Sequence, residues 1–179
     1  MNKIYFAGFD NYSPVAEMFR RKYRAVCSKY GYKAIFPISN RTLRDKYGES
    51  LSTPLDESRA MFEENLRRID SANIVIANLG YSFELCTNNT AFEIGYAHSK
   101  HKQVIGYRDV EFGMRLYNAQ EKIAFQSIRN PHRPPANLMV VCAMPVIIQG
   151  ELEDCLDWIL KDPLEENRRM LDFDEDETL

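Results

Sequence analysis

The chain has 179 residues, a hydrophobic fraction of 45% and a net charge of −3, values that describe one globular domain rather than a disordered chain. No basic cluster accumulates along it, which argues against a protein that binds a nucleic acid polymer. No apolar run approaches the roughly 18–20 residues of a transmembrane helix, and the first residues do not resemble a signal peptide, so we expect a cytoplasmic protein without membrane contact.

The first third of the sequence predicts two strands and one helix. Residues 3–9 (KIYFAGF) are apolar on both faces and indicate a central parallel strand. A helix is predicted next, with Ser13 as its N-cap and Gly31 at its end. Residues 33–38 predict a second strand. The polar residues 39–55 that follow predict a long surface loop.

The middle of the chain predicts a strand-helix-strand unit. An amphipathic helix over residues 56–69 leads into a short apolar run, residues 74–79, which indicates a buried strand. A polar loop follows, and then a helix that opens near Thr90. Residues 103–107 predict the next strand. In doubly wound proteins, the loop between such a strand and its helix is where ligands bind.

The last part of the chain completes the alternation of strands and helices. After the polar segment 108–136 comes a final strand over residues 146–148 and a closing helix over residues 151–160. Five alternations predict an α/β protein, a single-domain doubly wound five-stranded parallel sheet of flavodoxin-like or Rossmann-like type. We expect the domain to span residues 1–165 and an acidic tail to span residues 166–179.

Familiar cofactor motifs do not occur at the expected carboxyl ends of the strands. Neither G-x-G-x-x-G nor G-x-x-x-x-G-K-[ST] is found, so dinucleotide and triphosphate binding lose their usual support. The four cysteines show no C-x-x-C spacing and no histidine at a ligand interval, which indicates reduced thiols rather than a metal site. We therefore expect no cofactor and no metal.

Glu93 allows two interpretations. Thr90-Ala91-Phe92-Glu93 has the S/T-x-x-E form of a capping box, in which the carboxylate would bind back to the backbone of Thr90. Alternatively, a carboxylate in the first turn of the helix is favoured in its charged form by the helix dipole and faces the ligand cleft. An ionised glutamate there is suited to attack the anomeric carbon of a sugar.

Several segments in the same order resemble nucleoside 2-deoxyribosyltransferases: KIYFAGF, DSANIVIANL, TNNTAFEIGYA, KQVIGY and NLM. The resemblance covers about residues 3–160. It implies cleavage of the N-glycosidic bond of 2′-deoxynucleosides through a covalent deoxyribosyl intermediate on Glu93, and transfer of the sugar to another base. Two alternatives stay open, hydrolysis of 2′-deoxynucleoside 5′-phosphates and a non-catalytic nucleotide-binding member of the same fold.

The resemblance also implies roles for individual residues. Tyr5 matches a tyrosine that hydrogen-bonds the nucleophile, and Gly8 matches a glycine where the ligand approaches the backbone closely. Asn137 and Met139 match an element that reaches the site of a neighbouring subunit, which implies a homodimer or higher homo-oligomer with shared active sites. The expected partners are a nucleoside or nucleotide and a free base. The substrate-binding residues implied are Gly8, Phe9, Asn73, Thr87, Asn89, Asn137 and Met139.

The sequence departs from the family pattern at positions that usually carry acids. Asn73 stands for an aspartate just before the third strand, which handles the proton of the base. Ser39 and Thr87 stand for two further aspartates, and Asn89 replaces a glycine. With less negative charge nearby, we expect the pKa of Glu93 to be lowered. The expected cost is weaker activation of the leaving base, because an amide cannot donate a titratable proton.

Overall fold

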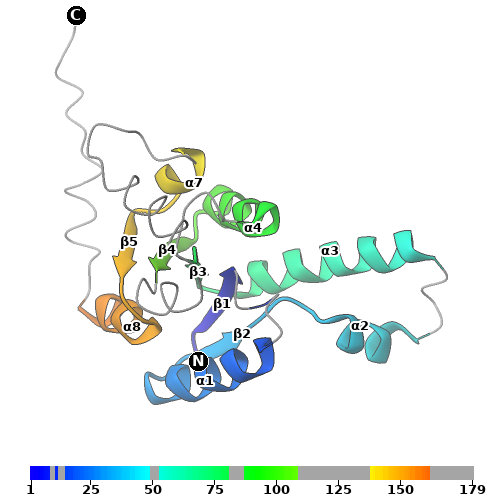
Figure 1. Cartoon of the computed structure of the whole chain (residues 1–179), viewed down its shortest axis with the longest axis horizontal. Coiled ribbons are helices and arrows are strands. Elements are labelled where there is room, and N and C mark those ends of the chain that lie inside the picture. The colour runs from blue at the N-terminus through cyan, green and yellow to red at the C-terminus, as the bar shows by residue number, and fades with distance from the viewer. Residues whose placement is uncertain (9–10, 12–14, 49–52, 81–86, 109–137, 162–179) are drawn as a thin grey trace, which may run out of the picture.

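The computed structural model describes residues 1–8, 11, 15–48, 53–80, 87–108 and 138–161. Within these residues, five strands form one fully parallel sheet in the order β2-β1-β3-β4-β5 (Figure 1). This order confirms the predicted doubly wound α/β fold. The strands are β1 (Lys3–Gly8), β2 (Lys33–Ile35), β3 (Ile74–Asn78), β4 (Gln103–Arg108) and β5 (Val146–Gln149).

Helices cover both faces of the sheet, which is why the central strands are apolar on both sides. On one face, side chains of α1 (Ala16–Lys29) and α8 (Leu152–Leu160) pack against Ile4, Phe6 and their neighbours. On the other face, α3 (Pro54–Ser71), α4 (Asn88–Ser99) and α7 (Leu138–Cys142) pack against a second cluster that contains Tyr5 and Val75. Tyr5 therefore belongs to the face that α4 covers.

The segment between β2 and β3 is more helical than the sequence predicted. The loop expected over residues 39–55 is wrong, because α2 (Asn40–Tyr47) forms within it. Ser39 caps this helix, since its side chain accepts a hydrogen bond from the backbone N–H of Thr42 at 3.2 Å. The helix is polar and carries few buried side chains, so apolar periodicity gave no signal for it.

Two boundaries near the carboxyl edge of the sheet also differ from expectation. Strand β2 ends at Ile35 rather than at residue 38, which leaves Pro37 and Ile38 beyond the strand. The expected N-cap Ser13 lies outside the described residues, and α1 begins at Ala16. Both differences are of the size expected for element ends read from sequence.

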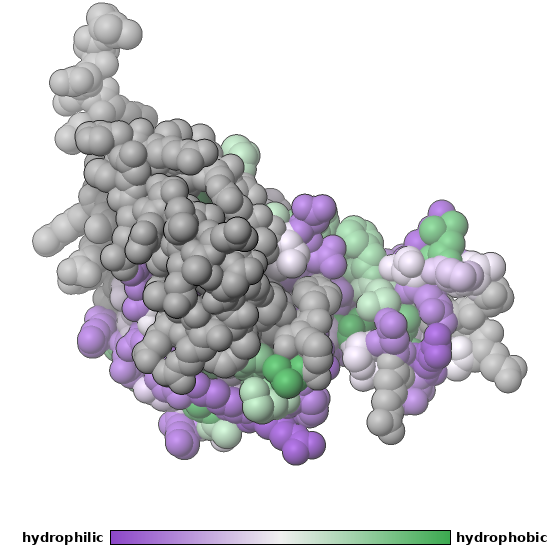
Figure 2. All heavy atoms as spheres, in the orientation of Figure 1, coloured by the Kyte–Doolittle hydropathy of each residue, from purple (hydrophilic) through white to green (hydrophobic). Residues whose placement is uncertain are grey.

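Helices α2 and α3 extend beyond the sheet as an arm (Figure 1). Glu64 of α3 ties them together, because its carboxylate pairs with Lys46 of α2 at 2.7 Å and with Arg68 at 3.1 Å. Figure 2 shows apolar and polar surface mixed along this arm. Two of its apolar residues are at least half exposed, Leu55 at 59% and Phe62 at 50%.

The last described element is α8, which ends at Leu160. The predicted boundary between a domain of residues 1–165 and a tail of residues 166–179 therefore lies outside the described residues. None of the helices in the described part of the chain combines the length and the apolarity needed to cross a membrane.

Candidate active site

Glu93 lies in the second turn of α4, directly above strand β1. Its side chain is buried, with 5% of the residue exposed. The hydroxyl of Tyr5 in β1 donates a hydrogen bond to its Oε1 at 2.7 Å, and Tyr5 is itself fully buried. Tyr5 and Glu93 are 88 positions apart in the chain, and the sequence analysis assigned both to one site. The fold brings their side chains into contact.

The capping-box interpretation of Glu93 is wrong. Helix α4 begins at Asn88, and its N-cap is Thr87, whose side chain accepts a hydrogen bond from the backbone N–H of Thr90 at 3.2 Å. The helix thus starts earlier than the expected opening near Thr90, and Glu93 falls outside the first turn. Glu93 is not used to cap the helix, and the helix dipole acts on it less than predicted.

The electrostatic state of Glu93 is set by burial. Burial raises the pKa of its carboxyl from 4.5 to about 7, and the hydrogen bond from Tyr5 opposes this rise. The expectation of a lowered pKa is wrong. Desolvation disfavours the charged form of Glu93, and this effect is larger than the gain expected from having neutral residues where the family has acids. Its second oxygen, Oε2, is buried without a hydrogen-bond partner among the described residues.

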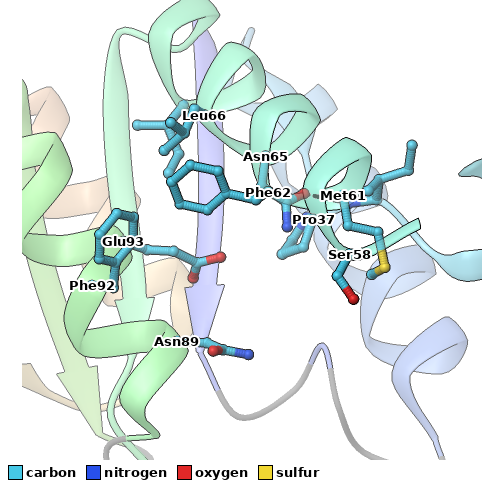
Figure 3. A pocket seen from close by; sticks show the side chains of 11 residues that line it. Pro37, Ser58, Met61, Phe62, Asn65, Leu66, Asn89, Phe92 and Glu93 are labelled. Atoms are coloured by element: carbon cyan, nitrogen blue, oxygen red, sulfur yellow. Dashed lines mark hydrogen bonds between the residues drawn. The ribbon is translucent and has the colours of Figure 1, made fainter. Parts of the chain in front are cut away.

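The carboxyl of Glu93 faces a cavity of about 440 Å³ between α3, α4 and the segment that follows β2 (Figure 3). A volume of this size is typical of small-molecule sites. Most of its wall is apolar. The described residues that line it are Pro37, Ile38, Ser58, Met61, Phe62, Asn65, Leu66, Ile69, Asn89, Phe92 and Glu93.

Asn65 is a residue of this site that the sequence analysis did not assign. It projects from α3 into the cavity that Glu93 enters from α4 (Figure 3). Its Oδ1 accepts a hydrogen bond from the backbone N–H of Ile38 at 2.8 Å. The available signal was its place on the apolar stripe of a predicted amphipathic helix, where a polar side chain is out of pattern.

Gly8 closes β1 but does not line this cavity. Its φ is +120°, and a Cβ added there would lie 2.2 Å from the carbonyl oxygen of Asn78 in β3. Close packing against β3 and the positive φ are by themselves enough to require glycine at this position. Phe9, the next predicted substrate contact, lies outside the described residues.

Asn73 is not brought to the cavity. It lies just before β3, at the amino end of that strand, where its Oδ1 accepts a hydrogen bond from the backbone N–H of Lys3 at 2.9 Å, and it does not line the cavity. Ser39 and Thr87, the other two neutral replacements, serve as N-caps of α2 and α4. Those three positions consequently have local structural roles, and none of them lines the cavity.

The remaining predicted contacts divide between two cavities. Asn89 lines the Glu93 cavity (Figure 3). Met139 is 82% exposed on α7 and lines a second cavity of about 410 Å³ between α4 and α7, so it is not a core residue within this subunit. Asn137 lies outside the described residues. No group of three potential metal ligands occurs in the part of the chain that the structure describes.

Comparison with known proteins agrees with this geometry. The model of a family described as nucleoside 2-deoxyribosyltransferase matches residues 4–139. A conserved protein from Enterococcus faecalis V583 is 19% identical with a TM-score of 0.56, over 90% of this chain and 98% of that one. The CMP N-glycosidase BcmB of Clostridium botulinum is 9% identical with a TM-score of 0.47, over 88% and 98%. No curated protein matches the chain.

Proposed function

The chain belongs to the nucleoside 2-deoxyribosyltransferase family, whose activity is N-glycosyl transfer or hydrolysis, and we propose that it transfers 2-deoxyribose between bases through an ester on Glu93. One observation carries this proposal. A buried carboxyl, held at one oxygen by Tyr5, presents its other oxygen without a hydrogen-bond partner among the described residues, beside an apolar cavity of nucleoside size.

The proposed reaction has two displacements. In the first, Oε2 of Glu93 attacks C1′ of the sugar, the C1′–O bond forms, and the C1′–N bond breaks with its electron pair on the base. In the second, a nitrogen of another base attacks C1′ and gives up its proton to water, and the C1′–O bond breaks with its electron pair on the Glu93 carboxylate. Two displacements at one carbon retain the configuration of the sugar. Tyr5 holds the attacking carboxylate in place during both steps.

The lining of the cavity favours a nucleoside over a nucleotide. Tight binding of a phosphate usually uses arginine, lysine or a group of backbone N–H donors. Neither arginine nor lysine occurs among the described residues that line the Glu93 cavity. The apolar side chains of Phe62 and Phe92 instead offer surface on which a flat base can pack.

Incubation with one 2′-deoxynucleoside and a second free base tests the proposal. A new deoxynucleoside supports transfer, whereas free deoxyribose or its phosphate would show that water is the acceptor. Intact-mass spectrometry with a 2′-fluoro nucleoside analogue should reveal an adduct of one sugar per chain. The adduct should disappear in Glu93→Gln and persist in Glu63→Gln, which changes an exposed glutamate of α3. Absence of an adduct and of products with every base would refute the proposal.

A further inference from the structure

The amide of Asn65 has one orientation available to it. Its Oδ1 must face Ile38, because the backbone N–H of Ile38 is a donor and the reversed amide would place two donors against each other. No group in the described part of the chain bonds to the Nδ2 of Asn65. On the α3 wall, the amide of Asn65 therefore presents a hydrogen-bond donor to the cavity rather than an acceptor.

The described residues that line the cavity include one acid. Among the described lining residues, Ser58, Asn65, Asn89 and Glu93 carry polar side chains, and only Glu93 has a carboxyl. If Glu93 forms the bond to the sugar, none of these side chains is left that could protonate the departing base as a general acid. A base that meets only these described side chains departs with its negative charge, and a donor is the group that stabilises such a charge.

We infer that the base leaves as an anion whose charge is stabilised by the Nδ2–H of Asn65, so that the substrates are 2′-deoxynucleosides of bases that are acidic at the leaving nitrogen. This inference rests on the proposed function. It assigns Asn65 of α3 to the base and Glu93 of α4 to the sugar, on opposite walls of one cavity (Figure 3).

The electrons balance without a proton from the enzyme. As Glu93 Oε2 bonds to C1′, the pair of the C1′–N bond passes to the base and is delocalised onto its ring carbonyl or ring nitrogen. That atom accepts the hydrogen bond from Asn65. The base takes a proton from water after it is released. Lactam bases such as uracil, whose anions are resonance-stabilised, fit this route better than cytosine, whose departure is assisted more by protonation.

A series of substrates measures the charge on the leaving base. The first-turnover rate of base release is compared for 2′-deoxyuridine, its 5-fluoro and its 5-methyl derivatives at pH 7. With no general acid, the rate should rise by on the order of tenfold or more from the 5-methyl to the 5-fluoro compound. 2′-Deoxycytidine should react more slowly than 2′-deoxyuridine. Equal rates across the series would overturn the inference.

Two variants of Asn65 separate its role from a structural one. Asn65→Asp keeps the acceptor for Ile38 but adds an acid, so the dependence on the leaving base should flatten. The rate at which Asn65→Asp releases base from 2′-deoxyuridine should also fall at the upper end of the range from about pH 5.5 to 8.5, where the added acid loses its proton. The native enzyme should show no such fall. Asn65→Leu removes the donor and should slow every member of the series by on the order of 100-fold.

The outcomes distinguish this inference from the proposed function. Release of base by Asn65→Leu at the native rate, or an unchanged pH profile in Asn65→Asp, would overturn the role of Asn65 while Glu93 chemistry stands. If the native chain releases base from purine deoxynucleosides but from none of these compounds, the inference fails and the proposed function stands. If it releases no base from any deoxynucleoside or 5′-phosphate, both fail. Urea denaturation of both variants checks that each is folded in the assay.

Discussion

At the scale of single residues, Glu93 carries an energetic cost that the proposed catalytic role would explain. A folded-state pKa of about 7 against an ordinary value of 4.5 means that folding resists ionisation of this carboxyl. The cost is absent below pH 4.5, grows between pH 4.5 and 7, and is complete above pH 7. A buried acid with an unpaired oxygen is destabilising unless a ligand uses it, and active sites often contain such groups.

The substitution Glu93→Gln should accordingly stabilise the protein at pH 8 by about 3 kcal/mol, because the neutral amide pays no ionisation penalty. The gain should vanish near pH 4, where the native carboxyl is already protonated. Urea denaturation at the two pH values measures it. A variant that is less stable than the native protein at pH 8 would show that a partner outside the described residues compensates the charge.

Tyr5 should control the pH at which Glu93 becomes reactive. Its hydrogen bond lowers the pKa of Glu93, so Tyr5→Phe should raise that pKa above about 7. Because only the ionised carboxylate attacks, adduct formation should rise with pH through about 7 in the native enzyme and at higher pH in the variant. Tyr23→Phe, which removes a buried hydroxyl bonded to Tyr107 on the opposite face of the sheet, is the control and should leave the profile in place.

At the scale of elements, the junction of β1 and β3 should tolerate no side chain at Gly8. The substitution Gly8→Ala would set a Cβ against the carbonyl oxygen of Asn78, at a φ of +120° that disfavours alanine. We expect a loss of about 2–4 kcal/mol in the free energy of unfolding. Gly31→Ala, at a φ of +79° just after the C-cap of α1 and with open space around it, should cost only about 1 kcal/mol. Equal losses for the two in thermal unfolding would contradict the packing argument.

The attachment of α2 to α3 should depend on Glu64. Burial raises the pKa of this carboxyl, but the hydrogen bond from Lys46 and the charge of Arg68 outweigh burial, so the pKa lies below its ordinary value. The stabilisation is therefore present above about pH 4.5 and is lost as the pH falls through the lowered pKa. Glu64→Gln should cost about 1–3 kcal/mol at pH 7 and much less at pH 3.

Limited proteolysis adds a local measurement to that prediction. Cleavage within α2 should become faster in Glu64→Gln, because the pair of this carboxylate with Lys46 is one of the contacts that hold the helix to α3, beside the pair of Arg44 with Glu57. The control Glu63→Gln removes an exposed pair with Arg67 at 3.6 Å and should change neither stability nor cleavage measurably. If α2 is cleaved at the same rate in the native protein, Glu64→Gln and Glu63→Gln, contacts other than Glu64 hold this helix to α3.

At the scale of the whole molecule, the exposed Met139 bears on assembly. A methionine that is 82% exposed beside an apolar cavity between α4 and α7 is consistent with the predicted contact to a second subunit. Light scattering should find a dimer or a larger assembly, and Met139→Glu should shift it toward the monomer with loss of activity. Met18→Glu, at a residue 56% exposed on α1, should do neither. An active monomer would contradict shared sites.

The sequence by itself determined the alternation of strands and helices and the parallel sheet, which follow from local periodicity and from handedness rules for strand-helix-strand units. The pairing of Tyr5 with Glu93 was implied by the resemblance to nucleoside 2-deoxyribosyltransferases. The polar helix α2 escaped prediction, because it buries a single apolar side chain, Leu43, among the residues described and is otherwise attached by the Ser39 cap and by ion pairs to α3, so it has no apolar stripe.

Only the tertiary structure decided what those residues do for one another. It fixed the start of α4 at Asn88, which took Glu93 out of the capping role, and it buried that carboxyl enough to raise its pKa rather than lower it. It left Asn73 at the amino edge of the sheet and put Asn65 across from Glu93. Burial, orientation and contact between distant segments depend on packing in three dimensions, and no local pattern in the chain records them.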